Sequence, residues 1–107
     1  MTTMTKAKRA AFAASAAEAA GLLRALANER RLLILCDLGG NELSVSELQE
    51  RLDISQSALS QHLAVLREQG LVATRREAQT IYYCIADPAV AKVIATLASI
   101  YCPEKLR

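Results

Sequence analysis

The sequence contains no apolar stretch that approaches the roughly 18–20 residues needed to cross a bilayer. Residues 1–23 are basic and then Ala-rich, as in a secretory signal peptide, but Glu18 interrupts the run and alanine is only weakly hydrophobic. We therefore expect no signal peptide and no membrane partner. These absences predict a cytoplasmic protein.

The sequence is also poor in the residues that build covalent frameworks and metal sites, with three cysteines and one histidine. Disulfides are rare in the reducing cytoplasm, so Cys36, Cys84 and Cys102 are expected to be structural thiols, metal ligands or redox groups. The absence of a CxxC motif argues against a thiol enzyme such as a small peroxidase or a persulfide transferase. We expect the chain not to be an enzyme.

A strong net charge is missing as well, because the formal net charge is only +2. Charge placement therefore matters more than its sum for any attraction to nucleic acid. No repeat or low-complexity linker divides the chain, so residues 1–107 are expected to form one domain, with a flexible N-terminus over about residues 1–9. The apolar content of 52% exceeds what one small core needs, and its surplus lies at the two ends, which predicts an obligate homodimer.

Helix signals cover most of the chain. The Ala-rich run from about Ala10 to Ala27 predicts a long first helix. Capping residues mark the starts of four more helices, which are expected from Asn28 to about Leu38, from Ser44 to about Leu52, from Ser55 to Gly70, and from Asp87-Pro88 to Cys102. The inward-facing side chains of the fourth helix are predicted to be Ala58, Leu59, Leu63 and Leu66, and the last helix has an apolar stripe of Val90, Val93, Ile94, Leu97, Ile100 and Tyr101.

After Gly70 the pattern changes to that of strands. Leu71–Arg75 and Thr80–Ala86 are rich in β-forming residues and flank Arg76-Glu77-Ala78-Gln79, which predicts a hairpin with a basic tip. The resulting order, α-α-α-α-β-β-α, is that of a mainly α (α+β) fold. We predict a winged helix-turn-helix with an extra helix at each end.

The helix that starts at Ser55 carries a polar tip that suits the DNA major groove. Ser55 is expected to cap this helix, and capping is also the alternative role for Ser57. The residues predicted to reach base edges are Gln56, Ser57, Ser60 and Gln61, because Gln can pair bidentately with adenine and Ser is compatible with several bases. A module that binds only protein would leave this polar tip without a purpose.

Basic and amide side chains near the hairpin complete the predicted DNA-binding set. Arg67, Arg75, Arg76 and Gln79 are candidates for phosphate or minor-groove contacts, with an ion pair as the alternative for Arg67. A two-fold dimer would read double-stranded DNA as an inverted repeat whose half-sites lie about 34–36 Å apart.

Four segments of the chain form a recognisable set: Asn28-Glu29-Arg30-Arg31-Leu32, Leu43-Ser44-Val45-Ser46-Glu47-Leu48, Ser55-Gln56-Ser57-Ala58-Leu59-Ser60-Gln61-His62-Leu63 and Arg67-Glu68-Gln69-Gly70-Leu71-Val72. Through these segments the chain resembles the ArsR/SmtB family of bacterial repressors from Asn28 to Cys102, about 70% of its length. The resemblance implies a DNA-binding dimer that is built through its first and last helices.

Many members of that family sense metals, and this chain lacks the residues of their usual sites. Ser44 and Ser46 stand where such relatives have cysteines, and Ser hydroxyls are poor ligands for soft or borderline cations. The last helix offers one Asp and no His for the other family site. His62 is interpreted as a structural or phosphate-facing residue. We therefore expect no metal and no cofactor.

The remaining candidates for a sensor are Cys36 and Cys102. A cysteine pair so placed is similar to the sulfide- and oxidant-responsive branch of the family, the BigR, SqrR and HlyU type, in which thiols of the second and last helices react within one subunit. The resemblance implies a repressor that binds its operator when reduced. Persulfides, other reactive sulfur or peroxide would oxidise Cys36 and Cys102 to a di- or polysulfide bridge and weaken binding.

Two alternatives stay open within this function class. The chain could instead be an antirepressor, and so an activator, of the HlyU type. It could also be a metal-responsive repressor that uses both cysteines and a third ligand. The sequence does not decide which thiol attacks first, and Cys84 is expected only to pack.

Overall fold

Side-chain caps fix where four of the helices begin, as the sequence predicts. The Asn28 side chain accepts hydrogen bonds from the backbone N–H groups of Arg30 and Arg31. Ser44 and Glu47 form a complete capping box, with distances of 3.1 Å and 2.9 Å. Ser55 and Asp87 cap the next two helix starts in the same way. These bonds satisfy N–H groups that would otherwise lack partners in the first turn.

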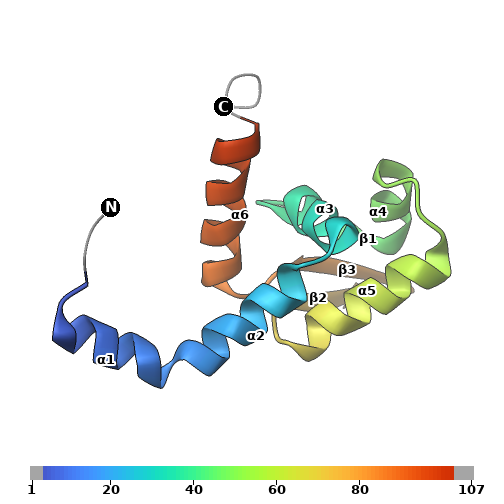
Figure 1. Cartoon of the computed structure of the whole chain (residues 1–107). Coiled ribbons are helices and arrows are strands. Elements are labelled where there is room, and N and C mark those ends of the chain that lie inside the picture. The colour runs from blue at the N-terminus through green and yellow to red at the C-terminus, as the bar shows by residue number, and fades with distance from the viewer. Residues whose placement is uncertain (1–3, 103–107) are drawn as a thin grey trace.

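The computed structural model describes residues 4–102 of the chain. Along the described part, the elements are α1 (Lys6–Ala14), α2 (Ala16–Leu26), α3 (Glu29–Leu38), β1 (Leu43–Ser44), α4 (Val45–Arg51), α5 (Gln56–Glu68), β2 (Val72–Glu77), β3 (Thr80–Ile85) and α6 (Pro88–Tyr101). Helices α4 and α5 form the helix-turn-helix, and the β2–β3 hairpin is the wing (Figure 1). The predicted winged helix-turn-helix fold is confirmed.

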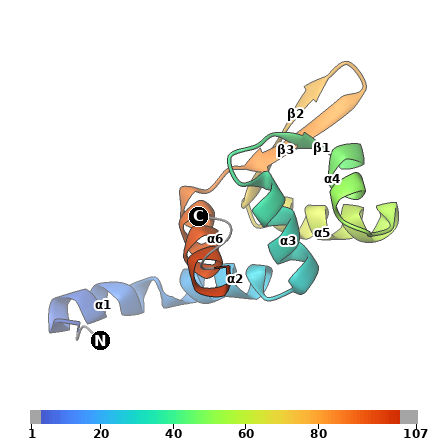
Figure 2. The same ribbon diagram turned by 90° about the horizontal axis from the view of Figure 1, so that it is seen from above.

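The sheet is antiparallel, in the order β1-β3-β2, and the wing projects from the helical body (Figure 2). Two features of the sheet differ from the prediction. The first strand, β1, pairs Leu43 with Tyr83 and was not expected, because two residues are too short to show a strand pattern. Strand β2 extends to Glu77, so the turn consists only of Ala78 and Gln79.

The core lies between α3, α5 and the base of the sheet. The largest side chains that are fully buried are Ile34, Leu35, Leu38, Leu48, Leu59, Leu63, Leu66 and Val90. All three Leu residues predicted to face inward from α5 are among them, and Ala58 is half-buried. Arg31 joins α2 to α3, because its side chain donates hydrogen bonds to the carbonyl oxygens of Ala25 and Arg24 at the end of α2. Positive charge at a helix C-terminus is favourable.

The N-terminal region is not the single helix that its alanines predict. It consists of α1 and α2, which are separated at Ser15, where the backbone N–H bonds to the Phe12 carbonyl oxygen. Serine favours a helix less than alanine, and no residue of α1 is buried, so no packing holds the two segments on one axis. Helix α1 begins at Lys6, inside the segment predicted to be flexible, of which residues 1–3 lie outside the described residues.

Helices α1 and α2 form an arm that is attached to the body at the end of α2, where Ala25 and Leu26 are buried, and that extends away from it toward α1 (Figures 1 and 2). The radius of gyration is accordingly 15.7 Å, with extents of 51 × 33 × 21 Å. A compact domain of this length has a radius of gyration of about 13 Å. Within residues 4–102, no helix combines the length and apolarity that a bilayer crossing requires.

Candidate nucleic-acid interface and thiol pair

The residues predicted to read bases lie together on the N-terminal half of α5. Gln56, Ser57, Ser60 and Gln61 are all exposed. Because residues four apart lie one turn apart on the same side of a helix, Gln56 is aligned with Ser60 and Ser57 with Gln61. The Ser55 hydroxyl accepts a hydrogen bond from the Ala58 N–H at 3.2 Å and lies 3.4 Å from the Ser57 hydroxyl. Ser55 is therefore the cap, and the other four form one polar face.

An open groove of about 490 Å³ continues from this face toward the wing. It is lined by Ser60, Ala64, Arg67 and Glu68 of α5 and by Tyr83 of β3. No ion pair within residues 4–102 involves Arg67. Its guanidinium is therefore available to a ligand in the groove. Sequence reasoning missed Tyr83, although its alternation with Tyr82 along β3 puts only one of the two rings on this side.

The wing residues divide into two groups. Arg76 and Gln79 lie at the tip, where the Arg76 Nε donates a hydrogen bond to the Ala78 carbonyl oxygen at 3.0 Å and Gln79 is exposed. Arg75 instead forms a bidentate ion pair with Glu42 and a further one with Glu77. The guanidinium of Arg75, also predicted to contact DNA, is thus already held by two carboxylates.

His62 lies behind the polar face and is half-buried. Its pKa is lowered by burial and, to a smaller extent, by the positive charges of Arg31 and Arg30 on α3. Both effects disfavour the protonated ring. His62 stays interpreted as a structural or phosphate-facing residue, and it belongs to no cluster of three potential metal ligands among residues 4–102.

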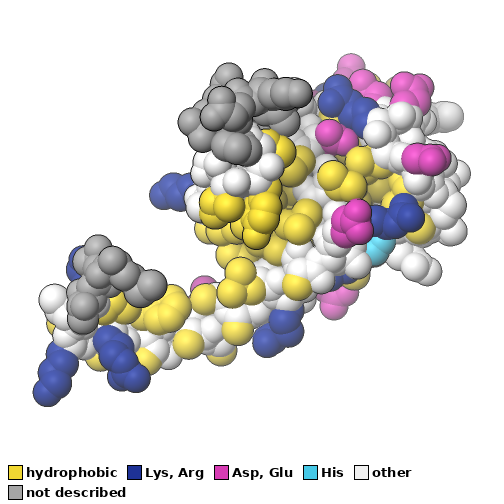
Figure 3. Space-filling model, turned by 45° about the horizontal axis from the view of Figure 1, so that its top comes forward, with side chains coloured by type: hydrophobic (Ala, Val, Ile, Leu, Met, Phe, Trp, Pro, Cys, Tyr) yellow, Lys and Arg dark blue, Asp and Glu magenta, His cyan; other side chains and the backbone are white. Residues whose placement is uncertain are grey.

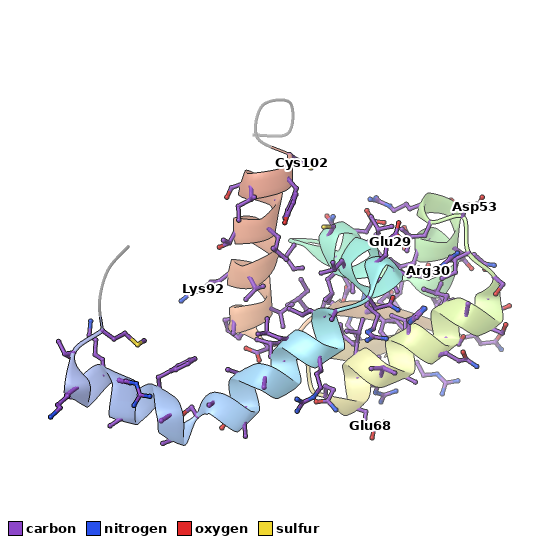
Figure 4. All side chains as sticks on the ribbon, viewed as in Figure 1. Glu29, Arg30, Asp53, Glu68, Lys92 and Cys102 are labelled. Atoms are coloured by element: carbon purple, nitrogen blue, oxygen red, sulfur yellow. The ribbon has the colours of Figure 1, made fainter. Side chains whose placement is uncertain are left out.

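The two candidate redox cysteines belong to neighbouring elements. Cys36 is in the last part of α3 and Cys102 is the C-cap of α6, and these helices contact each other. Both thiols are free and exposed, and Figure 4 shows Cys102 at the end of α6. Cys84 is also free and is half-buried in β3. The two exposed thiols are close enough to interact electrostatically, as the effect of Cys102 on the pKa of Cys36 indicates.

The surroundings of Cys36 oppose its ionisation. Although Cys36 is partly exposed, the partial burial of its thiol is the largest cause that raises its pKa, followed by the negative charges of Asp37 and Cys102. A thiolate is the reactive form of cysteine, so these effects make Cys36 slow to react at neutral pH. Asp37, to which sequence reasoning gave no role, thus acts against the activated thiolate that an enzyme would need.

Ser44, one of the two serines that the family resemblance aligns with metal-binding cysteines, has a structural role here. Ser44 is 7% exposed, and both its backbone and its hydroxyl are used in the capping box of α4. Among the described residues, no three His, Cys, Asp or Glu side chains gather closely enough to hold a metal ion. The structure therefore offers no third ligand for Cys36 and Cys102 within that part of the chain.

Apolar side chains remain uncovered on the arm and on α6. Phe12 of α1 and Leu23 of α2 are 53% and 59% exposed, and Ile100 and Tyr101 of α6 are 58% and 77% exposed. Figure 3 shows apolar atoms gathered over α6 and along the facing side of the arm. The end of the stripe predicted on the last helix is thus exposed in the single chain.

Known proteins share this architecture. The family model described as "Bacterial regulatory protein, arsR family" matches residues 28–74, which span α3, α4, α5 and the start of β2. The transcriptional activator HlyU of Vibrio cholerae is 58% identical over 82% of this chain and 82% of its own. The solved structure of reduced HlyU from that species has a TM-score of 0.81 at 56% identity, covering 85% of this chain and 96% of the other.

A repressor has the same fold. The solved structure of the transcriptional repressor BigR from Xylella fastidiosa has a TM-score of 0.85 at 39% identity, covering 94% of this chain and all of the other. Fold, polar helix face and sequence similarity agree, and the chain belongs to the arsR family of bacterial regulatory proteins, as a DNA-binding regulator of transcription.

Proposed function

We propose that the protein is a cytoplasmic, homodimeric regulator whose binding to operator DNA is weakened when Cys36 and Cys102 are oxidised. The observation that carries the proposal is the placement of the two free, exposed thiols on contacting helices of one chain, within electrostatic range of each other. A bond between them would tie α3, which supports the helix-turn-helix, to α6. Reactive sulfur species or peroxide would act as the inducer.

The DNA-binding part of the proposal rests on the polar face of α5 and the wing tip. Gln56, Ser57, Ser60 and Gln61 would contact base edges in the major groove. Arg67, Arg76 and Gln79 would contact phosphates or the minor groove. These assignments are supported by the exposure of all seven side chains and by the groove that joins α5 to β3.

The proposed dimer rests on the uncovered apolar side chains of α1, α2 and α6. Monomeric proteins rarely leave large apolar patches exposed. A second copy of the chain would cover this patch and would place two copies of α5 for a two-fold symmetric site, which is an inverted repeat in double-stranded DNA.

Either inducer can act as the two-electron oxidant that joins the two thiols. With hydrogen peroxide, one thiolate attacks oxygen to give a sulfenic acid and hydroxide, and the second thiol then displaces water to form the disulfide. With two equivalents of a persulfide, each thiol accepts one sulfur and releases one thiol. The two resulting Cys persulfides then condense to a trisulfide bridge and hydrogen sulfide. A direct disulfide needs Cα atoms within about 7 Å, whereas a bridge with added sulfur spans more.

The decisive experiment measures DNA binding before and after oxidation. Wild-type protein should select a duplex from a randomised library and release it after treatment with glutathione persulfide or peroxide. Cys36→Ser and Cys102→Ser should each abolish the release, and Cys84→Ser should retain it as the matched control. Intact mass spectrometry should show the loss of two hydrogens with peroxide and, with persulfide, the gain of one sulfur atom together with the loss of two hydrogens. Release that persists in both Ser variants would refute the thiol switch.

A second candidate role is activation, which the similarity to the activator HlyU favours. In this role the reduced protein would displace another DNA-binding protein instead of blocking transcription itself. A reporter in a strain that lacks the gene separates the two roles. Expression that rises on deletion indicates repression, and expression that falls indicates activation.

A further inference from the structure

Arg75 is held by more partners than any other basic side chain whose contacts the structure describes. Its Nη2 and Nε donate to the two carboxylate oxygens of Glu42 at 2.8 Å and 3.0 Å. Its Nη1 donates to Glu77 at 2.9 Å, and its guanidinium lies 4.8 Å from the centre of the Tyr82 ring. The paired geometry matches the planar fork of arginine, for which lysine is no substitute.

Strand alternation puts Arg75 on the side of the sheet that faces away from α5. Arg75 lies opposite Tyr82, whereas Thr74 lies opposite Tyr83. Neighbouring residues of a strand point to opposite faces, so Arg75 and Tyr82 share one face and Tyr83 lies on the other. Tyr83 lines the groove beside Arg67 of α5. Arg75 therefore points away from the groove that is bordered by the DNA-reading helix.

Of the two carboxylate partners of Arg75, Glu42 belongs to the body of the molecule and Glu77 to the wing itself. Glu42 immediately precedes β1, in the loop that follows α3. That loop is attached to the last turn of α3, because Asn41 donates a side-chain hydrogen bond to the Asp37 carbonyl oxygen at 3.0 Å and a backbone one to the Leu38 carbonyl oxygen. The ion pair between Glu42 and Arg75 thus connects the wing to the end of α3.

We propose that Arg75 is a positioning residue that fixes the wing against the body through Glu42 and does not itself contact DNA. Two carboxylates neutralise its charge, so it has little positive charge left to offer a phosphate. The wing contacts would then come from Arg76 and Gln79, whose orientation depends on this ion pair. The proposal concerns the DNA-binding activity of the family and does not depend on the thiol switch.

Three variants distinguish positioning from contact. Arg75→Lys keeps the positive charge but loses the bidentate pair, and Glu42→Gln keeps Arg75 but removes its anchor. Glu77→Gln is the matched control, because it removes an equal charge from the same guanidinium without touching the link to the body. Fluorescence anisotropy with a duplex selected by the wild-type protein gives the affinity, and its salt dependence gives the number of phosphate contacts.

If Arg75 positions the wing, Arg75→Lys and Glu42→Gln each weaken DNA binding by about fivefold while the salt dependence is unchanged, and Glu77→Gln stays within about twofold of wild type. If Arg75 contacts a phosphate, Arg75→Lys retains affinity and Glu42→Gln binds more tightly. The second result would overturn the proposal, as would equal weakening by the Glu42 and Glu77 variants.

Hydrogen exchange provides a measurement that needs no DNA. Amides of β2 and β3 should exchange faster in Glu42→Gln than in Glu77→Gln, while those of α5 are unchanged. Equal exchange in the two variants would overturn the positioning role even if no duplex were selected. Thermal melts followed by circular dichroism show whether a variant is folded. If Glu42→Gln is unfolded, amide hydrogen exchange is compared between Arg75→Lys and Glu77→Gln instead.

Discussion

The thiol of Cys36 ionises less readily than that of a free cysteine, and the contribution of Asp37 can be removed by a conservative substitution that leaves both thiols in place. Asp37→Asn should lower the pKa of Cys36 and raise its alkylation rate by iodoacetamide at pH 7 by about twofold, since burial, the larger cause, stays. In wild type the rate should keep rising beyond pH 9.0, the ordinary pKa of a cysteine, because the pKa of Cys36 is raised above that value and the thiolate fraction is still increasing there.

Peptide-level mass spectrometry measures this rate for Cys36 separately from the other thiols. Asp53→Asn is the matched control for Asp37→Asn, because it also removes one negative charge but lies in the turn between α4 and α5. Equal rates in the two variants would show that Asp37 has no influence on the thiol.

Ala78 has the left-handed backbone angle φ 56° at the first position of the two-residue wing turn. A positive φ at this position alone is the pattern of a type II′ turn, which favours glycine there. Ala78→Gly should therefore raise the free energy of unfolding by about 0.5–1 kcal/mol, because a side chain strains this conformation. Urea denaturation measures the change. Ala73→Gly, in the regular backbone of β2, should instead lower the free energy of unfolding. If both variants were stabilised, the assignment of a type II′ turn at Ala78 would be contradicted.

At the scale of elements, Ser44 is the residue on which α4 depends. Ser44→Ala removes the capping box and should lower the free energy of unfolding by about 1–2 kcal/mol. Ser46→Ala should change it by less than about 0.5 kcal/mol, because Ser46 is exposed and caps nothing. Denaturation of both variants in urea checks the difference, and similar losses would mean that the cap is not what stabilises α4.

The caps also explain how much of the fold could be predicted from the sequence. Asn28, Ser44 and Ser55 act on backbone groups within three residues, so a local pattern suffices to locate helix starts and the polar face of α5. The break at Ser15 was missed because it reflects missing packing around the arm, which alanine propensity does not record. Strand β1 and the pairing of Glu42 with Arg75 depend on residues far apart in sequence, so only the folded chain reveals them.

At the scale of the whole molecule, the extended arm and α6 leave apolar surface that one chain does not cover. Leu23→Glu and Ile100→Glu should each raise the dissociation constant of the proposed dimer by about tenfold or more, because a charge would be buried in an apolar interface. Analytical ultracentrifugation measures this constant.

Leu33→Glu is the control for these two variants. Leu33 is also 48% exposed, but it lines a separate hollow between α3 and the turn before α5. Arg30 and Asp53, which line the same hollow, are labelled in Figure 4. This variant should leave the dimer intact. Dissociation by Leu33→Glu alone would place the interface elsewhere.

The contact between α3 and α6 has a consequence for protein turnover. A bridge from Cys36 to Cys102 would close a covalent ring that contains α4, α5 and the wing. Closing a ring of this size stabilises a fold by about 4 kcal/mol in the chain-entropy model. Oxidised protein should therefore melt at a higher temperature than reduced protein and resist proteases longer. Cells would then keep the DNA-free form for longer after the oxidant has gone, so the regulator would retain a record of past exposure until the bridge is reduced.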